Sequence, residues 1–234
     1  MRGEQPSPVP VADPADMTLD ELRLHLAPHI ADAAVFDGWS DAALAEAARS
    51  TGVDHDVARL AFGEPGRAGA MGMIGAWIET IDAAMAAALP PETLAGMKIR
   101  ERIRSLVQFR LDAVGPGREE ALRRALAVMA MPQNAAAALK AGWRSADIMW
   151  RLAGDTATDW NHYSKRAILA SLYGATLAVF ASDESEGKAE TRAFLDRRIE
   201  GVMRFEKFKH QWLQPRGEHF SPVRFLGRLR YPAR

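Results

Sequence analysis

Residues 36–63 read FDGWSDAALAEAARSTGVDHDVARLAFG, and this stretch has the pattern of two helices joined by a tight turn. Ser40 is a residue type that caps helix N-termini, Gly52 suits the turn, and Asp54 precedes the second helix. The apolar positions of the first helix recur at the spacing of one helical face: Leu44, Ala47 and Ala48. The stretch therefore predicts a helix-turn-helix-like unit, which we extend over residues 18–63.

In the order and spacing of its predicted helices this unit resembles the TetR family of regulators. In that family an N-terminal three-helix unit binds DNA and a larger helical domain holds a ligand. The second helix nevertheless opens with Asp54, His55 and Asp56, and Arg59 is its only fixed cation. Carboxylates in that position oppose the attraction to phosphates that supplies most non-specific DNA binding. We therefore expect a TetR-like fold with no nucleic acid as partner. A TetR-type ligand-responsive transcription regulator is the alternative.

Helix-forming residues dominate the rest of the chain and strand patterns are nearly absent, so the sequence predicts an all-α protein. The expected helices span residues 18–35 (bent or broken at Pro28), 40–50, 54–62, 70–89, 97–114, 117–131, 133–153, 156–181 and 187–213. The expected parts are a disordered leader (1–17), the helix-turn-helix-like unit (18–63), a larger helical domain (64–213) and a basic, aromatic tail (214–234).

The composition excludes several kinds of site. The 234 residues include no cysteine, which excludes disulfides, thiolate metal sites and thiol nucleophiles. Lys plus Arg equals Asp plus Glu at 30 each, but residues 1–60 carry a net charge of −7 and residues 207–234 a net charge of +6. No apolar run reaches the roughly 18 residues of a membrane span. We therefore expect a soluble or peripheral protein in a reducing compartment.

The motifs of known catalytic centres are missing from the sequence. His25 and His29 have a metal-ligand spacing, but Pro28 lies between them and no HExxH glutamate accompanies them. Asp159 and His162 form a DxxH, without the paired Glu-x-x-His motifs that a di-iron bundle uses. We expect no catalytic residue, no metal and no cofactor.

Residues 155–166, DTATDWNHYSKR, begin with helix-capping residue types and predict a helix start. One face of that helix carries Tyr163, Arg166, Ala167, Ala170, Tyr173 and Leu177, and an adjoining face carries Leu169, Leu172, Thr176 and Phe180. The same helix pattern directs Trp160, His162 and Lys165 toward solvent, where we expect them to anchor an interface. Arg166 lies one turn before the apolar run, where its guanidinium could bind the anionic head group of a lipid. The alternative is routine packing of Trp160 beside solvated cations.

The chain resembles the lipid-binding accessory protein family of coenzyme Q (ubiquinone) biosynthesis, the ninth in that pathway's naming series. The resemblance is carried by GDTATDWNHYSKRAILASLYGATLAVFASDESEG, FDGWSDAALAEAA, KIRERIRSLVQFRLDAV, ALRRALAVMAMPQNAAAALKAGWRSADIMWRLAG and AFLDRRIEGVMRFEKFK, and it covers roughly residues 18–210. It implies a TetR-like fold without DNA binding, a homodimer, and a hydrophobic pocket for isoprenoid quinone or phospholipid tails. It also implies presentation of quinone intermediates to the demethoxyubiquinone hydroxylase, by a cytoplasmic protein peripheral on the inner membrane (on the matrix side in a eukaryote).

Carried over by residue, the resemblance implies a partner-contact role for Tyr163, while His162 stands where the family usually has Trp. Together with Trp160 and Lys165, which the helix pattern places toward solvent, these residues form the expected partner surface. The resemblance also implies that Arg166 contacts the lipid head group, so that Arg166→Ala reduces co-purified lipid without unfolding the protein. The expected pocket residues are Met129, Met131, Leu139, Trp143, Ile148, Trp150, Leu169, Tyr173 and Leu177, for which ordinary core packing is the alternative.

The C-terminal residues combine basic with aromatic and aliphatic side chains, a composition typical of membrane interfaces. The expected membrane-contacting residues are Arg224, Phe225, Leu226, Arg228, Leu229 and Arg230. Family members end similarly, in an amphipathic membrane-seeking helix. Pro215, Pro222 and Pro232 disfavour a continuous helix here. A disordered solubilising tail is the alternative.

Overall fold

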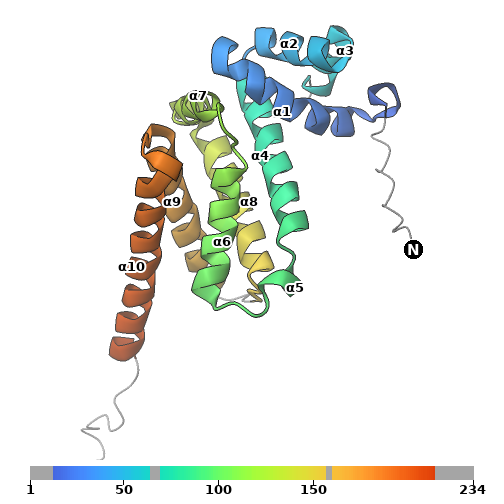
Figure 1. Ribbon diagram of the computed structural model, residues 1–234. Helices are drawn as coiled ribbons and strands as arrows, with labels where there is room; N and C mark the ends of the chain where they lie inside the picture. The colour runs from blue at the N-terminus through green and yellow to red at the C-terminus, as the bar shows by residue number, and fades with distance from the viewer. Residues whose placement is uncertain (1–12, 64–68, 157–159, 214–234) are drawn as a thin grey trace, which may run out of the picture. The chain divides into compact units, whose positions relative to one another are not determined.

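The computed structural model describes residues 13–63, 69–156 and 160–213, apart from the side chains of residues 160, 161 and 205–213. Every regular element in these ranges is helical, which confirms the predicted all-α class (Figure 1). The α-helices are α1 (Leu19–Asp37), α2 (Asp41–Thr51), α3 (His55–Ala61), α4 (Gly69–Ala88), α5 (Pro91–Leu94), α6 (Ile99–Asp112), α7 (Glu119–Met129), α8 (Ala135–Leu152), α9 (Trp160–Ser182) and α10 (Ala189–Leu213).

The helix-turn-helix signals act as the sequence predicts. Ser40 Oγ accepts a hydrogen bond from the Ala43 N–H at 3.4 Å, at the start of α2. Asp54 Oδ1 accepts one from the Asp56 N–H at 2.9 Å, at the start of α3. Gly52 ends α2 in the left-handed region, with φ 72°, a conformation that glycine adopts without steric cost. These caps fix where the chain turns between the two helices.

Helix α1 continues through Pro28, so of the two predicted outcomes at this residue, a bend or a break, the break is wrong. Proline has no N–H to donate to the Leu24 carbonyl, and this loss normally interrupts a helix. Leu26 and Ile30, on either side of the proline, are fully buried. Because the buried face of α1 runs past Pro28 without interruption, packing outweighs the local cost of the missing hydrogen bond.

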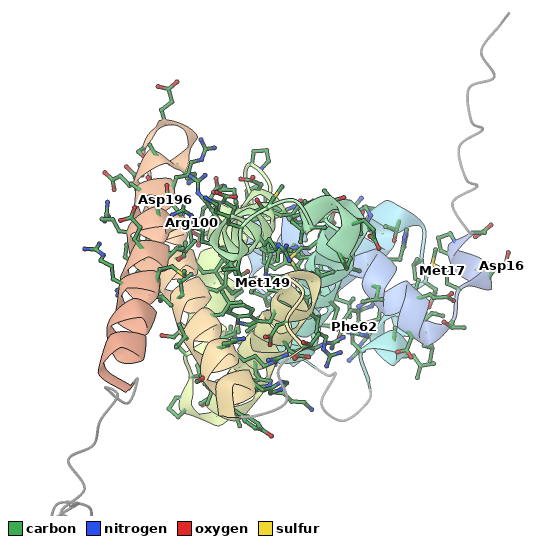
Figure 2. The ribbon with its side chains drawn as sticks, turned by 90° about the horizontal axis from the view of Figure 1, so that it is seen from below. Asp16, Met17, Phe62, Arg100, Met149 and Asp196 are labelled. Atoms are coloured by element: carbon green, nitrogen blue, oxygen red, sulfur yellow. The ribbon has the colours of Figure 1, made fainter. Side chains whose placement is uncertain are left out.

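Helices α1, α2 and α3 pack on one another, and α1 also packs against α4. Figure 1 shows these three helices gathered at one end of α4, and the remaining length of α4 contacts α6, α7 and α8. Figure 2 shows Met149 of α8 inside this bundle, where its side chain is fully buried. Residues up to Leu195 form one compact unit and residues from Asp196 a second, so α10 contains the boundary.

None of the helices in the described part of the chain combines the length and the apolar character needed to cross a membrane.

The connection from α9 to α10 is organised by the buried carboxylate of Asp183. Its Oδ1 accepts hydrogen bonds from the Ser185 N–H at 2.9 Å and hydroxyl at 2.5 Å. Its Oδ2 accepts from the Thr191 N–H at 2.8 Å and hydroxyl at 2.6 Å. Burial alone would raise the pKa of Asp183, but these four hydrogen bonds hold the pKa well below its usual range.

Acidification should therefore cost this protein stability through Asp183. A carboxyl whose pKa is lower in the folded chain stabilises the fold above its unfolded pKa of about 3.9, and the contribution is lost as the pH falls below that value. We expect the free energy of unfolding, measured by urea denaturation, to fall less between about pH 6 and about pH 3 in Asp183→Asn than in the wild type. Glu184→Gln, at the exposed neighbouring position, is the control. Equal losses in all three proteins would contradict the prediction.

Candidate functional site

A cavity of about 890 Å³ lies among α4, α6, α7, α8 and α9, within the range of small-molecule sites. Its lining consists almost wholly of aliphatic, aromatic and small residues. The lining residues are Ile74, Trp77, Ile78, Ile81, Arg110, Val114, Leu122, Ala125, Leu126, Met129, Ala130, Ala135, Ala138, Leu139, Ala141, Gly142, Trp143, Ser145, Ala167, Ala170, Ser171, Tyr173, Gly174 and Leu177.

Small residues on two helices leave the space for this cavity. Ala138 and Gly142 stand one turn apart on α8, and Ala170 and Gly174 one turn apart on α9. Residues four apart share one helix face, so each helix presents a shallow strip to the cavity. A Cβ atom added at Gly142 or Gly174 would meet no neighbouring atom within 4 Å. The cavity therefore exists because these positions carry glycine or alanine, whereas larger side chains would fill the space.

Five of the nine predicted pocket residues line the cavity: Met129, Leu139, Trp143, Tyr173 and Leu177. On the predicted α9 face, Ala167, Ala170, Tyr173 and Leu177 line the cavity, whereas Tyr163 and Arg166 do not. Leu139 is 75% exposed although it lines the cavity, which places it where the cavity opens to solvent.

The other four predicted pocket residues lie outside the lining. Leu169 is buried on the adjoining face of α9, and Met131 is exposed after the end of α7. The Trp150 Nε1–H donates to the Lys165 carbonyl at 2.9 Å and so ties α8 to α9. Ile148 is half-buried but does not reach the cavity. The last turns of α8 therefore serve packing, and only its earlier turns face the cavity.

A buried polar cluster, formed by Arg110, Asp82, Ser145 and Tyr173, stands at the cavity wall. Arg110 is 1% exposed and forms an ion pair with Asp82 through Nη1. Its Nη2–H donates to Ser145 Oγ at 3.0 Å, and its Cζ lies 4.8 Å from the centroid of the Tyr173 ring. Burial raises the pKa of Asp82, against the opposing effect of Arg110. Burial also works to lower the pKa of Arg110, but Tyr173 and Asp82 outweigh it and raise this pKa.

Sequence reasoning missed this cluster, although one signal was present. Arg110 lies on the apolar face of α6, at helical spacing from the buried residues Ile103, Leu106 and Val107. A fixed charge in such a position requires a buried partner on another helix. Asp82 supplies that partner from α4, 28 residues earlier in the chain.

Arg166 does not line the cavity. Its side chain is 2% exposed and pairs with Asp147 (Nε to Oδ1, 2.5 Å) and Asp155 (Nη1 to Oδ2, 3.1 Å). Its Nη1–H also donates to the His162 carbonyl at 3.0 Å. Both carboxylates also pair with a second cation, Arg151 or Lys165. Arg166 therefore lies in a largely buried ion-pair network of α8, α9 and their connection, and not in the cavity wall where the head-group role would place it.

The expected partner surface is only partly described. Tyr163 is 57% exposed, and its ring centroid lies 6.1 Å from that of Trp143, which lines the cavity. The His162 ring meets the Tyr163 ring edge-on at 5.1 Å. The Lys165 Nζ lies 2.7 Å from Asp155 Oδ1, so this cation is paired and not simply solvated. The side chain of Trp160 and all of the expected membrane-contacting residues (Arg224, Phe225, Leu226, Arg228, Leu229 and Arg230) lie outside the described residues.

The fold and the cavity define the class: an all-α protein of the TetR-regulator fold with an internal apolar cavity. The chain is similar to the crystal structure of the TetR transcriptional regulator from Nitrosomonas europaea, with a TM-score of 0.62 and 22% identity over 79% of this chain and 99% of that one. At this level of identity the likeness shows the fold.

Sequence comparison adds a set of named relatives. Residues 135–206 match the COQ9 family model. The ubiquinone biosynthesis protein COQ9, mitochondrial, of Rattus norvegicus is 33% identical over 176 residues, which cover 71% of this chain and 54% of that protein. The Homo sapiens protein of the same name is 31% identical over 176 residues, 71% of this chain and 52% of that protein. The chain is thus similar to the COQ9 proteins, most specifically over residues 135–206, and it spans about half the length of these curated relatives.

Proposed function

We propose that this chain is a non-catalytic lipid-binding accessory protein of ubiquinone biosynthesis. It binds isoprenoid quinone intermediates or phospholipid at the membrane and presents substrate to the demethoxyubiquinone hydroxylase, as a homodimer peripheral on the inner membrane. The names of its relatives support the pathway. The observation that carries the binding function is the apolar cavity of about 890 Å³, because α8 and α9, which supply much of its lining, lie in the COQ9 domain.

The chemistry of the lining supports a lipid as ligand. Apolar surface removed from water contributes about 25 cal/mol per Å², so a few hundred Å² of buried chain would contribute several kcal/mol. Met129, Trp143 and Leu177 offer adaptable and large apolar contacts for a flexible chain. A small polar metabolite would gain little from such walls.

Two exposed residues support the proposed place of partner contact. Leu139 lines the cavity where it opens, and the exposed Tyr163 ring lies 6.1 Å from the ring of the lining residue Trp143. Exposed aromatic residues beside a pocket are typical of interaction hot spots. A partner or membrane that covers Leu139 and Tyr163 would therefore receive a ligand directly from the cavity.

Native mass spectrometry with lipid extraction on the purified full-length protein tests the proposal. We expect a dimer that carries a polyisoprenoid quinone or a phospholipid. A protein that is empty and also fails to take up either lipid from vesicles would contradict the binding function.

The TetR-like fold favours one further candidate, a ligand-responsive transcription regulator. In α3, however, Arg59 is already paired with Asp41 (Nε to Oδ1, 3.3 Å), and Asp54 and Asp56 stand at the helix start. We expect the full-length protein to show no binding to duplex DNA at low ionic strength, where electrostatic binding is strongest. Fluorescence anisotropy over a salt series measures this, and affinity that falls steeply with added salt would favour the regulator.

A further inference from the structure

We propose that the cluster of Arg110, Asp82, Ser145 and Tyr173 binds the polar end of the cavity's ligand, and that it selects a neutral head group with oxygen acceptors over an anionic one. This inference rests on the proposed lipid-binding function. It names the chemical class of lipid, which that function leaves open between a quinone and a phospholipid.

The first argument is position. Arg110 is the one charged residue among the described residues that line the cavity, and Ser145 and Tyr173 line it too. Almost all other lining residues offer only apolar contacts. Apart from the Ser171 hydroxyl and two indole rings, a ligand with a polar head and an apolar tail therefore meets hydrogen-bonding groups, and its only charged group, at this part of the described wall, which would orient the molecule.

The second argument is an unused donor. The Arg110 Nε–H is buried and has no hydrogen-bond partner among the described residues, although Nη1 and Nη2 are occupied by Asp82 and Ser145. Leaving such a donor unsatisfied is costly, and native proteins rarely do so without a reason. A ligand oxygen beside Arg110 would supply the missing acceptor.

The third argument is charge. Asp82 is 4% exposed and already balances the charge of Arg110. An anionic head group would therefore bring an uncompensated charge into a buried site beside a carboxylate, at a large desolvation cost. A carbonyl or ether oxygen accepts the same hydrogen bond without that cost. Quinone rings carry such oxygens, whereas phospholipids carry a phosphate.

The experiment compares three ligands of one tail length: a benzoquinone with a farnesyl tail, farnesyl phosphate and farnesene, which has no head group. Each displaces an apolar fluorescent probe from the full-length protein. We expect the quinone to bind at least about tenfold more tightly than the other two, the lower end of what one hydrogen bond to a charged group contributes. Equal affinity for quinone and farnesene, or tighter binding of the phosphate, would overturn the inference while leaving lipid binding intact. Binding of none of the three would overturn both.

Two variants assign the preference to the cluster. Arg110→Met with Asp82→Leu removes both charges together, because a buried ion pair can be replaced by apolar residues without loss of fold. Arg110→Lys keeps the charge but removes the Nε donor. We expect each variant to lose the tenfold preference for the quinone over farnesene while it still binds farnesene. Ser171→Ala, a lining serine outside the cluster, is the matched control and should keep the preference. A preference retained in both variants would overturn the inference.

Discussion

Filling the cavity by Gly142→Leu together with Gly174→Leu is expected to reduce bound lipid about tenfold without unfolding the protein. Both glycines line the cavity, and a Cβ at either position meets no atom within 4 Å, so the new side chains extend into open space. If they displace roughly 60 Å² of ligand contact, about 1.5 kcal/mol is lost at 25 cal/mol per Å². Replacing glycine inside a helix also favours the helix itself by up to about 1 kcal/mol.

The measurement is the amount of lipid extracted per mole of purified protein, with thermal unfolding recorded in parallel. Ala136→Leu is the control, because it adds the same side chain to an exposed position of α8 that does not line the cavity. We expect this control to retain wild-type lipid content. If the double variant and the control carried equal lipid, the ligand would have to lie somewhere other than the cavity.

The positions of helix ends in this protein follow from the sequence because they depend on capping residues that act on their near neighbours. Ser40, Gly52 and Asp54 act in the structure as the sequence indicates, since a cap depends only on the nearest few residues. The same local reasoning gives the wrong result at Pro28. The missing hydrogen bond there disfavours the helix, but burial of α1 against other helices offsets this cost.

The cavity is predictable to the extent that helical periodicity applies. On α9 the spacing identifies the lining face from Ala167 to Leu177. On α8 the wide distribution of apolar residues does not reveal where the cavity ends, so the sequence predicts Ile148 and Trp150 in a lining to which they do not belong. The partner of Arg110 could not be predicted, because nothing in the sequence around Asp82 indicates which helix it faces.

The partners of Arg166 could not be predicted from the sequence either, and they lead to a prediction about stability. Its position before an apolar run resembles that of a head-group ligand, but its partners come from the end of α8 and from the α8–α9 connection. Arg166→Ala would leave the buried carboxylate of Asp155 and the partly buried carboxylate of Asp147 without the cation that joins them. We expect the free energy of unfolding to fall by about 3 kcal/mol, the lower end for breaking a buried ion pair, because Arg151 and Lys165 still contact these carboxylates. This loss of stability replaces the expectation that the variant folds normally.

The test compares the free energies of unfolding of Arg166→Ala and Arg151→Ala, measured by urea denaturation. Both cations pair with Asp147, but Arg166 is buried and Arg151 is exposed. Arg151 Nη2 lies 2.6 Å from Asp147 Oδ2, but the Arg151 side chain is 72% exposed. Removing an exposed partner typically costs about 1 kcal/mol or less, so we expect Arg151→Ala to stay near the wild type. If Arg166→Ala were as stable as Arg151→Ala and had lost its lipid, Arg166 would act on the ligand after all. Stability that falls only in Arg166→Ala would mean that this residue holds α8 and α9 together, and that any accompanying loss of lipid follows from the weakened wall of the cavity.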